Sequence, residues 1–122
     1  MWSNCLFVAL GGGLGAVGRY LLSLIAAPWS FPVMTLLTNV MGAVVIGAVA
    51  QAAGQLPMSK SAVLFLKTGL CGGFTTFSTF SLETVELLEQ GRWAAGGGYI
   101  LASVGLCLAG VLLGRALVWK IL

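Results

Sequence analysis

Small, hydroxyl-bearing and aromatic residues cluster between Gly69 and Ser81, within an otherwise apolar stretch of the chain. This segment has poor helix propensity, which predicts a backbone break near residues 72–76. Within a membrane, such a break is tolerated where it is buried in protein or lines a watery cavity. Carbonyl groups freed between Gly72 and Thr75 could bind a cation, and the positive end of the restarted helix would lie nearby. The alternative is a glycine-kinked helix that serves packing alone.

Beyond this break, residues three and four positions apart should share a helix face. One face then carries Phe77, Phe80, Ser81 and Thr84, and another carries Thr76, Thr79 and Glu83. Aromatic ring edges are electropositive, and hydroxyl groups can donate hydrogen bonds. Together these groups suit a small anion and suit a cation poorly, although core packing is the alternative role of the aromatic pair.

Two further polar positions belong to other apolar runs. Thr35, Thr38 and Asn39 occur together, and the Asn39 amide offers two donors. An intramembrane asparagine can also hold helices together. Arg19 has two interpretations: it either anchors or caps backbone carbonyls, or it draws anions into a vestibule.

The elements that position these residues are predicted to be membrane-spanning helices. The 122-residue chain is 59% hydrophobic and only 7% charged, far below the charged fraction of soluble domains. Four apolar runs predict an all-α integral membrane protein with one domain over residues 1–122. The expected helices cover residues 5–27, 33–54, 62–88, with the break at 72–76, and 94–119.

Local signals define the ends of these helices and their contacts. Two prolines predict a turn at 28–32, and Ser59 is expected to cap the third helix. The end of that helix should meet water at Glu83, Glu86 and Glu89, with Arg92 as a neutralising neighbour. Glycine pairs spaced four residues apart predict close helix packing at Gly11 and Gly15, Gly69 and Gly73, and Gly110 and Gly114.

Lysine and arginine are distributed too evenly to fix one orientation. Lys60, Lys67, Arg115 and Lys120 fall toward the side of the termini, and Arg19 and Arg92 fall toward the other. Insertion in both orientations is therefore a hypothesis, and an antiparallel dimer could then form from one sequence.

Three motifs together resemble the Fluc (CrcB) fluoride channel family. They are Gly12-Gly-Leu-Gly-Ala-Val-Gly-Arg-Tyr20 in the first helix, Thr35-Leu-Leu-Thr-Asn-Val-Met-Gly42 in the second, and Gly69 through Ser81 in the third. The predicted four-helix layout extends the similarity over essentially the whole chain, although the fourth helix has no sharp motif.

The resemblance implies an antiparallel, dual-topology homodimer with two fluoride pores. It also implies a structural sodium ion at the dimer interface, bound by the backbone carbonyls of Gly72 and Thr75. By motif position, Asn39 would line the pore, with Thr35 nearby, and Phe77 and Phe80 would contact fluoride. Ser78, Thr79 and Ser81 would form a hydroxyl track, Arg19 would lie in the vestibule, and Ser103 is the polar candidate from the fourth helix.

The resulting functional prediction is passive export of cytoplasmic fluoride across a bacterial or archaeal inner membrane. The lipid bilayer is the expected surrounding, and no nucleic acid is expected as a partner. A proton-coupled multidrug exporter is the main alternative. Such an exporter would need an acidic residue in the first helix, and this helix contains Arg19 but no acidic residue. A purely structural membrane subunit is a second alternative. An enzyme is least favoured, since the chain has no histidine and no nucleophile with a recognisable base.

Overall fold

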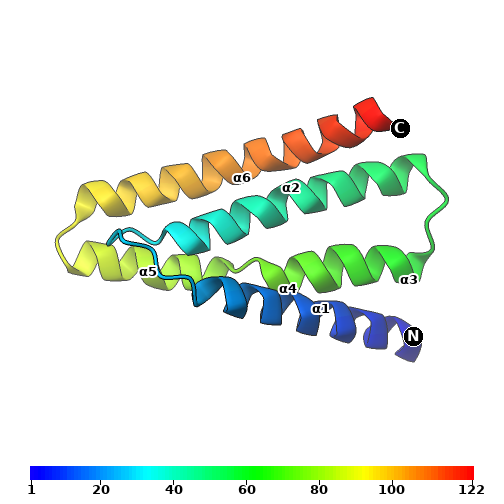
Figure 1. Ribbon diagram of the computed structural model, residues 1–122, viewed down its shortest axis with the longest axis horizontal. Coiled ribbons are helices and arrows are strands. Elements are labelled where there is room, and N and C mark those ends of the chain that lie inside the picture. Colours follow the sequence, from blue (N-terminus) through cyan, green and yellow to red (C-terminus); the bar gives the residue numbers. More distant parts are fainter.

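The computed structural model describes residues 1–122 as a bundle of four antiparallel helical passes (Figure 1). The first, second and fourth passes are continuous, and the third is divided into four short elements. The elements are α1 (Trp2–Ser23), α2 (Val33–Gln55), α3 (Lys60–Val63), the π-helix η1 (Leu64–Cys71), α4 (Gly72–Phe74), α5 (Phe77–Glu89) and α6 (Trp93–Ile121). The prediction of an all-α protein with a broken third helix is confirmed.

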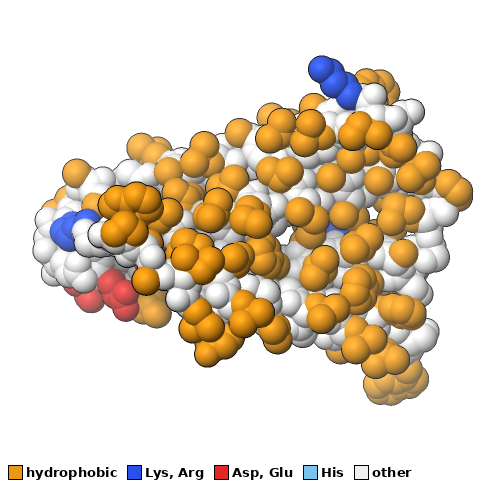
Figure 2. Space-filling view, viewed as in Figure 1, with side chains coloured by type: hydrophobic (Ala, Val, Ile, Leu, Met, Phe, Trp, Pro, Cys, Tyr) orange, Lys and Arg blue, Asp and Glu red, His pale blue; other side chains and the backbone are white.

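Lipid is the solvent that this surface requires. Three helices, α1, α2 and α6, are each long and apolar enough to cross a membrane. Hydrophobic side chains cover the visible face of the molecule along its whole length (Figure 2). Tryptophans, which favour the interface between lipid and water, are exposed near both ends of the bundle, at Trp2, Trp29, Trp93 and Trp119. We therefore describe the chain as a multi-pass membrane protein.

Element boundaries differ from the sequence prediction by up to four residues. The first helix ends at Ser23, earlier than the predicted residue 27, and a loop leads to the two prolines. Proline disfavours helical backbone in the residue before it, so the apolar stretch before Pro28 does not extend the helix. The break is confined to Thr75 and Thr76, and it follows an eight-residue π-helix that periodicity did not predict.

Close contacts at glycines join the four passes as two pairs, α1 with the third pass and α2 with α6. On one side, α1 packs against η1 and α4, where a Cβ on Gly11 or Gly15 would overlap backbone atoms of the third pass. On the other side, a Cβ on Gly47 or Gly114 would overlap the backbone across the contact between α2 and α6. The predicted role of the spaced glycine pairs in close packing is thus confirmed.

Both chain termini lie at one end of the bundle together with the link between α2 and α3 (Figure 1). We call this the terminal end. The links that join α1 to α2 and α5 to α6 lie at the opposite end, which we call the loop end. Ser59 caps α3 at the terminal end, as predicted, because its Oγ accepts a hydrogen bond from the Ala62 amide at 3.1 Å.

Candidate ion pathway at the helix break

The break consists of two extended residues between two helices. Thr75 and Thr76 have ψ angles of 156° and 111°, so the helical ladder stops at Phe74 and resumes at Phe77. The Thr76 hydroxyl caps the restarted helix by accepting a hydrogen bond from the Thr79 amide at 3.1 Å. The poor helix propensity of this segment therefore produces a defined interruption with its own cap.

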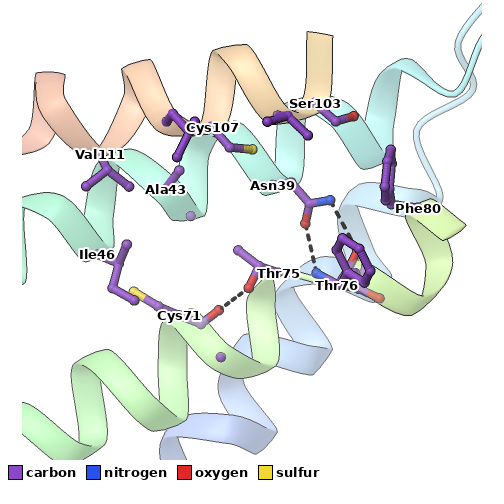
Figure 3. Close-up of a pocket in the computed structure, with 15 residues that line it drawn as sticks. Asn39, Ala43, Ile46, Cys71, Thr75, Thr76, Phe80, Ser103, Cys107 and Val111 are labelled. Carbon is purple, nitrogen blue, oxygen red and sulfur yellow. Dashed lines mark hydrogen bonds between the residues drawn. The ribbon is translucent and has the colours of Figure 1, made fainter. Parts of the chain in front are cut away.

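Asn39 of α2 completes the backbone hydrogen bonding of the break. Its Oδ1 accepts a hydrogen bond from the Thr76 amide at 2.8 Å, and its Nδ2 donates one to the Thr76 carbonyl at 3.2 Å. Figure 3 shows the pair of bonds between the two passes. Of the two N–H groups on Nδ2, one is thus used and one remains for another acceptor.

Arg19 also binds the broken segment. Its Nε donates a hydrogen bond to the Gly73 carbonyl at 3.1 Å. Of the two interpretations of Arg19 from the sequence, the carbonyl-capping one is therefore realised in the structure. Its two terminal amino groups still carry N–H donors beyond this bond.

The Gly72 and Thr75 carbonyls are among those that lose their helical donors at the break. The Thr76 amide, four residues after Gly72, bonds to Asn39, and the Thr79 amide, four residues after Thr75, bonds to the Thr76 hydroxyl. The Gly72 and Thr75 carbonyls are thus left to other partners, and both residues line one cavity. Backbone oxygens are the kind of ligand that a hard cation prefers, which agrees with the sodium site that the resemblance implies. No group of three or more His, Cys, Asp or Glu side chains is placed to hold a metal.

The larger cavity has a volume of about 400 Å³ and lies between α2, the broken third pass and α6. Figure 3 shows Ser103 and Cys107 facing Asn39 and Thr75 across it. None of its lining residues is charged. It brings together six of the predicted site residues, which are Asn39, Gly72, Thr75, Phe77, Phe80 and Ser103.

Ser103 is the one buried side chain of this cavity with an unused polar atom. The residue is 7% exposed, and its Oγ has no hydrogen-bond partner. A buried hydroxyl without a partner costs free energy, so a ligand or water is expected to satisfy it. The serine therefore marks a position on α6 at which the cavity can donate to an anion.

The smaller cavity, of about 140 Å³, lies on the other side of the break between α1, α2 and α5. Arg19 is its only charged residue, and hydroxyl-bearing residues dominate the rest of the lining: Tyr20, Ser23, Thr35, Thr38, Thr76 and Thr79. Thr76 lines both cavities. An arginine-lined cavity and an uncharged, partly aromatic cavity therefore share a wall at the break.

Two predicted site residues lie outside both cavities. Ser78 is exposed, and its hydroxyl lies 3.2 Å from the Thr76 hydroxyl. Ser81 donates its hydroxyl proton to the Phe77 carbonyl of its own helix at 2.9 Å. The predicted hydroxyl residues thus point in different directions, and Thr79 is the one that lines the smaller cavity.

Glu83 differs from the sequence expectation. Its carboxylate accepts hydrogen bonds from the hydroxyls of Thr35 at 3.1 Å and Tyr99 at 2.9 Å, and Tyr99 is fully buried. Arg92 is not its neutralising partner, because this guanidinium donates to the Ser30 carbonyl instead. The spacing of Glu83 with Thr76 and Thr79 could have suggested this inward position, whereas Tyr99 gave no signal within its glycine-rich run.

Aromatic rings extend from the larger cavity to the Glu83 site. Phe77 and Phe80 have ring centroids 5.4 Å apart, and Phe80 and Tyr99 have centroids 5.1 Å apart. The second pair meets edge to face, which is a favoured arrangement of aromatic rings. Phe80 therefore has a packing role in addition to lining the cavity.

The family model described as CrcB-like protein, Camphor Resistance (CrcB), matches residues 6–115. The chain belongs to the CrcB family. It is 49% identical over 115 residues to a Roseiflexus protein named fluoride-specific ion channel FluC, with 91% of this chain and 93% of that protein covered. A protein of the same name from Shewanella denitrificans is 46% identical, with coverages of 97% and 98%.

The resemblance inferred from three motifs is thus confirmed at the level of the family. The CrcB match includes the two residues that brace the break, Arg19 and Asn39, and all residues of both cavities. A relative from Ruminiclostridium cellulolyticum, also named fluoride-specific ion channel FluC, is 44% identical over 118 residues.

Proposed function

We propose that this CrcB protein is a fluoride-selective ion channel that lets cytoplasmic fluoride leave the cell down its gradient. The observation that carries the proposal is the chemistry of the two adjoining cavities. Their linings contain an amide, hydroxyls, aromatic rings and one arginine, and neither contains an acidic residue. Such side chains can donate to an anion, and neither cavity has a carboxylate side chain that would attract a cation.

In the proposed pathway, the arginine-lined cavity acts as the vestibule and the aromatic cavity as the selective part. Arg19 attracts the anion, and the Thr79 hydroxyl replaces part of its water, while Thr35 lines the same cavity with its hydroxyl proton donated to Glu83. Asn39 and Ser103 then offer donors on the larger cavity, where Phe77 and Phe80 present ring edges. Selectivity follows from narrowness together with donors placed for a small ion. We assign Ser78 and Ser81 to the outer part of the hydroxyl track.

A second copy of the chain is needed to complete this path. Phe77 is 78% exposed although its ring lines the larger cavity. A single subunit therefore leaves one wall of the cavity open to lipid. An antiparallel homodimer closes two such cavities at once. The terminal end carries four Lys or Arg residues and the loop end carries two, a difference compatible with insertion in both orientations.

A structural sodium ion is the cofactor that we assign to this assembly. The Gly72 and Thr75 carbonyls would hold it at the dimer interface, since their helical donors are used by Asn39 and Thr76. The ion would neutralise carbonyl dipoles that otherwise face each other across the interface. Replacing sodium by N-methylglucamine during purification should lower fluoride flux, and adding sodium back should restore it.

The cell location follows from the fold and the relatives. The chain is a multi-pass membrane protein, and the organisms of the relatives are prokaryotic, which supports the cytoplasmic membrane as its site. A channel function leaves no catalytic step to assign, so we propose no enzymatic activity. The multidrug exporter is set aside because α1 carries no acidic residue for proton coupling and the relatives are named as channels.

Complementation in cells tests the proposal. A bacterial strain without its own fluoride exporter should regain growth on fluoride when it expresses this chain. The Phe77→Ile variant, expressed at the same membrane level, should fail to restore growth. Equal failure of the natural chain and the variant, with both present as dimers, would support a structural subunit instead.

A further inference from the structure

The charged residues of the chain divide between the two ends of the bundle. All three acidic residues, Glu83, Glu86 and Glu89, are on α5 near the loop end. Figure 2 shows the acidic atoms gathered at this end, with basic atoms close to them, and further basic atoms at the far tip of the molecule. The terminal end has four cations and no acid, which are Lys60, Lys67, Arg115 and Lys120. The cations of that end therefore have no intramolecular counter-ion.

Lys67 and Arg115 both lie inside membrane-spanning passes, and Arg115 is the only arginine of these four cations. It precedes Trp119 by one helical turn, which places its Cα about 6 Å closer to the membrane centre. The residue is exposed, and the arginine side chains that do hydrogen-bond within the protein are Arg19 and Arg92. A guanidinium one turn from the end of the helix can extend to the interface, where an anion from outside the chain can pair with it.

The surface of α6 between Arg115 and the middle of the helix is apolar and exposed. Leu101 is 76% exposed and Leu112 is 68% exposed on the same helix face. Between them, a Cβ on Gly105 would meet no atom within 4 Å, so the stripe has an open notch. Trp119, 68% exposed, continues this face at the headgroup level.

We propose that an anionic phospholipid binds along this face of α6. Its phosphate pairs with the Arg115 guanidinium beside the Trp119 ring, and one acyl chain lies along Leu112 and the notch at Gly105. Arginine matches a phosphate with paired hydrogen bonds. A net negative headgroup such as phosphatidylglycerol is favoured over a zwitterionic one because the subunit has four cations and no acidic side chain at this end.

Quenching of Trp119 fluorescence by brominated lipids tests the proposal directly. Phenylalanine replaces Trp2, Trp29 and Trp93, and the protein is placed in bilayers with increasing brominated phosphatidylglycerol or brominated phosphatidylcholine. An arginine near the surface favours the anionic lipid by about fivefold. Half-maximal quenching of Trp119 should therefore require about fivefold less phosphatidylglycerol, and Arg115→Gln should abolish this preference.

Lys67→Gln is the matched control, because it removes one positive charge at the same end but from η1. The preference at Trp119 should survive this substitution. Equal loss of the phosphatidylglycerol preference in both variants would indicate a diffuse surface charge and overturn the α6 site. Equal quenching of Trp119 by the two lipids without either substitution would overturn it as well.

Native mass spectrometry of the chain with all four tryptophans provides an independent measurement should the single-tryptophan variant fold poorly. Retained phosphatidylglycerol should decrease in Arg115→Gln and remain in Lys67→Gln, and unchanged retention in Arg115→Gln would contradict the proposal. Neither readout depends on fluoride transport, so failure of the lipid site is distinguishable from failure of the channel function.

Discussion

The Asn39 side chain and the Thr76 backbone pair in both directions, through bonds of 2.8 and 3.2 Å. This pairing lets the third pass open within the membrane without leaving the Thr76 amide and carbonyl unsatisfied. Since Thr76 lines both cavities, the same contact fixes the wall between the vestibule and the aromatic cavity. Asn39 thus braces the break and keeps one amide N–H that is not bonded to Thr76.

Asn39→Ala should impair fluoride flux strongly. The substitution leaves two backbone groups of Thr76 without partners, each at a cost of about 1 to 3 kcal/mol. The third pass should then lose its fixed geometry at the break, although the glycine contacts keep the bundle folded. Initial fluoride efflux from liposomes measures the effect, with Asn4→Ala as the control near the chain terminus. Normal efflux in Asn39→Ala would remove Asn39 from the pathway.

Phe77→Ile should reduce fluoride flux with little change in subunit stability. The ring is 78% exposed in the subunit, so few internal contacts depend on it. Isoleucine retains an apolar surface but has no electropositive ring edge. Phe80→Ile should reduce both flux and stability because Phe80 also packs against Tyr99. Efflux rates and melting curves distinguish the two effects, and Phe7→Ile on the lipid-facing surface should alter neither. A fluoride efflux rate in Phe77→Ile equal to that of the unsubstituted protein would exclude a role for the Phe77 ring.

Tyr99→Phe should destabilise the protein by removing one of the two donors to the Glu83 carboxylate. A hydrogen bond to a charged group contributes about 1.5 to 3 kcal/mol. The matched control is Tyr20→Phe, because Tyr20 is 61% exposed. Thermal unfolding in detergent, followed by size-exclusion chromatography, should show a lower midpoint for Tyr99→Phe alone. Equal midpoints in the two variants would mean that the carboxylate finds another donor at no cost.

Gly15→Ala should disturb the contact between α1 and the third pass, whereas Gly13→Ala should not. A Cβ on Gly15 would overlap the Leu70 carbonyl and lie 2.7 Å from the Phe74 amide nitrogen. On Gly13 it would meet nothing within 4 Å. Overpacking of this kind typically costs about 1 to 3 kcal/mol. The yield of folded protein and its melting midpoint should fall in Gly15→Ala only; the same loss in both variants would argue against backbone contact as the cause.

Much of the fold could be predicted from the sequence because lipid imposes simple constraints. Apolar length locates the spans, and a helix of sufficient length satisfies its own backbone groups. Paired glycines next to Thr75 and Thr76 located the break for the same reason, since low helix propensity at membrane depth needs a specific compensation. The exact end of α1 at Ser23 depended on the loop and was not evident.

The partners of individual polar side chains were harder to predict. Helical spacing placed Glu83 on a face with Thr76 and Thr79, but the burial of that face depends on how α5 meets α2 and α6. The donor Tyr99 comes from α6, far away in sequence. The hydrogen bond from Arg19 to the Gly73 carbonyl likewise depends on the close packing of α1 against the third pass. These relationships arise from packing between helices, which local periodicity does not encode.

Ion release from liposomes that contain this chain as their only protein tests the channel most directly. Vesicles are loaded with fluoride or with chloride, the membrane potential is collapsed with a potassium ionophore, and release is followed with ion-selective electrodes. We predict rapid release of fluoride and retention of chloride. Retention of both ions by vesicles that contain folded dimers, or equal release of both, would contradict a fluoride-selective channel.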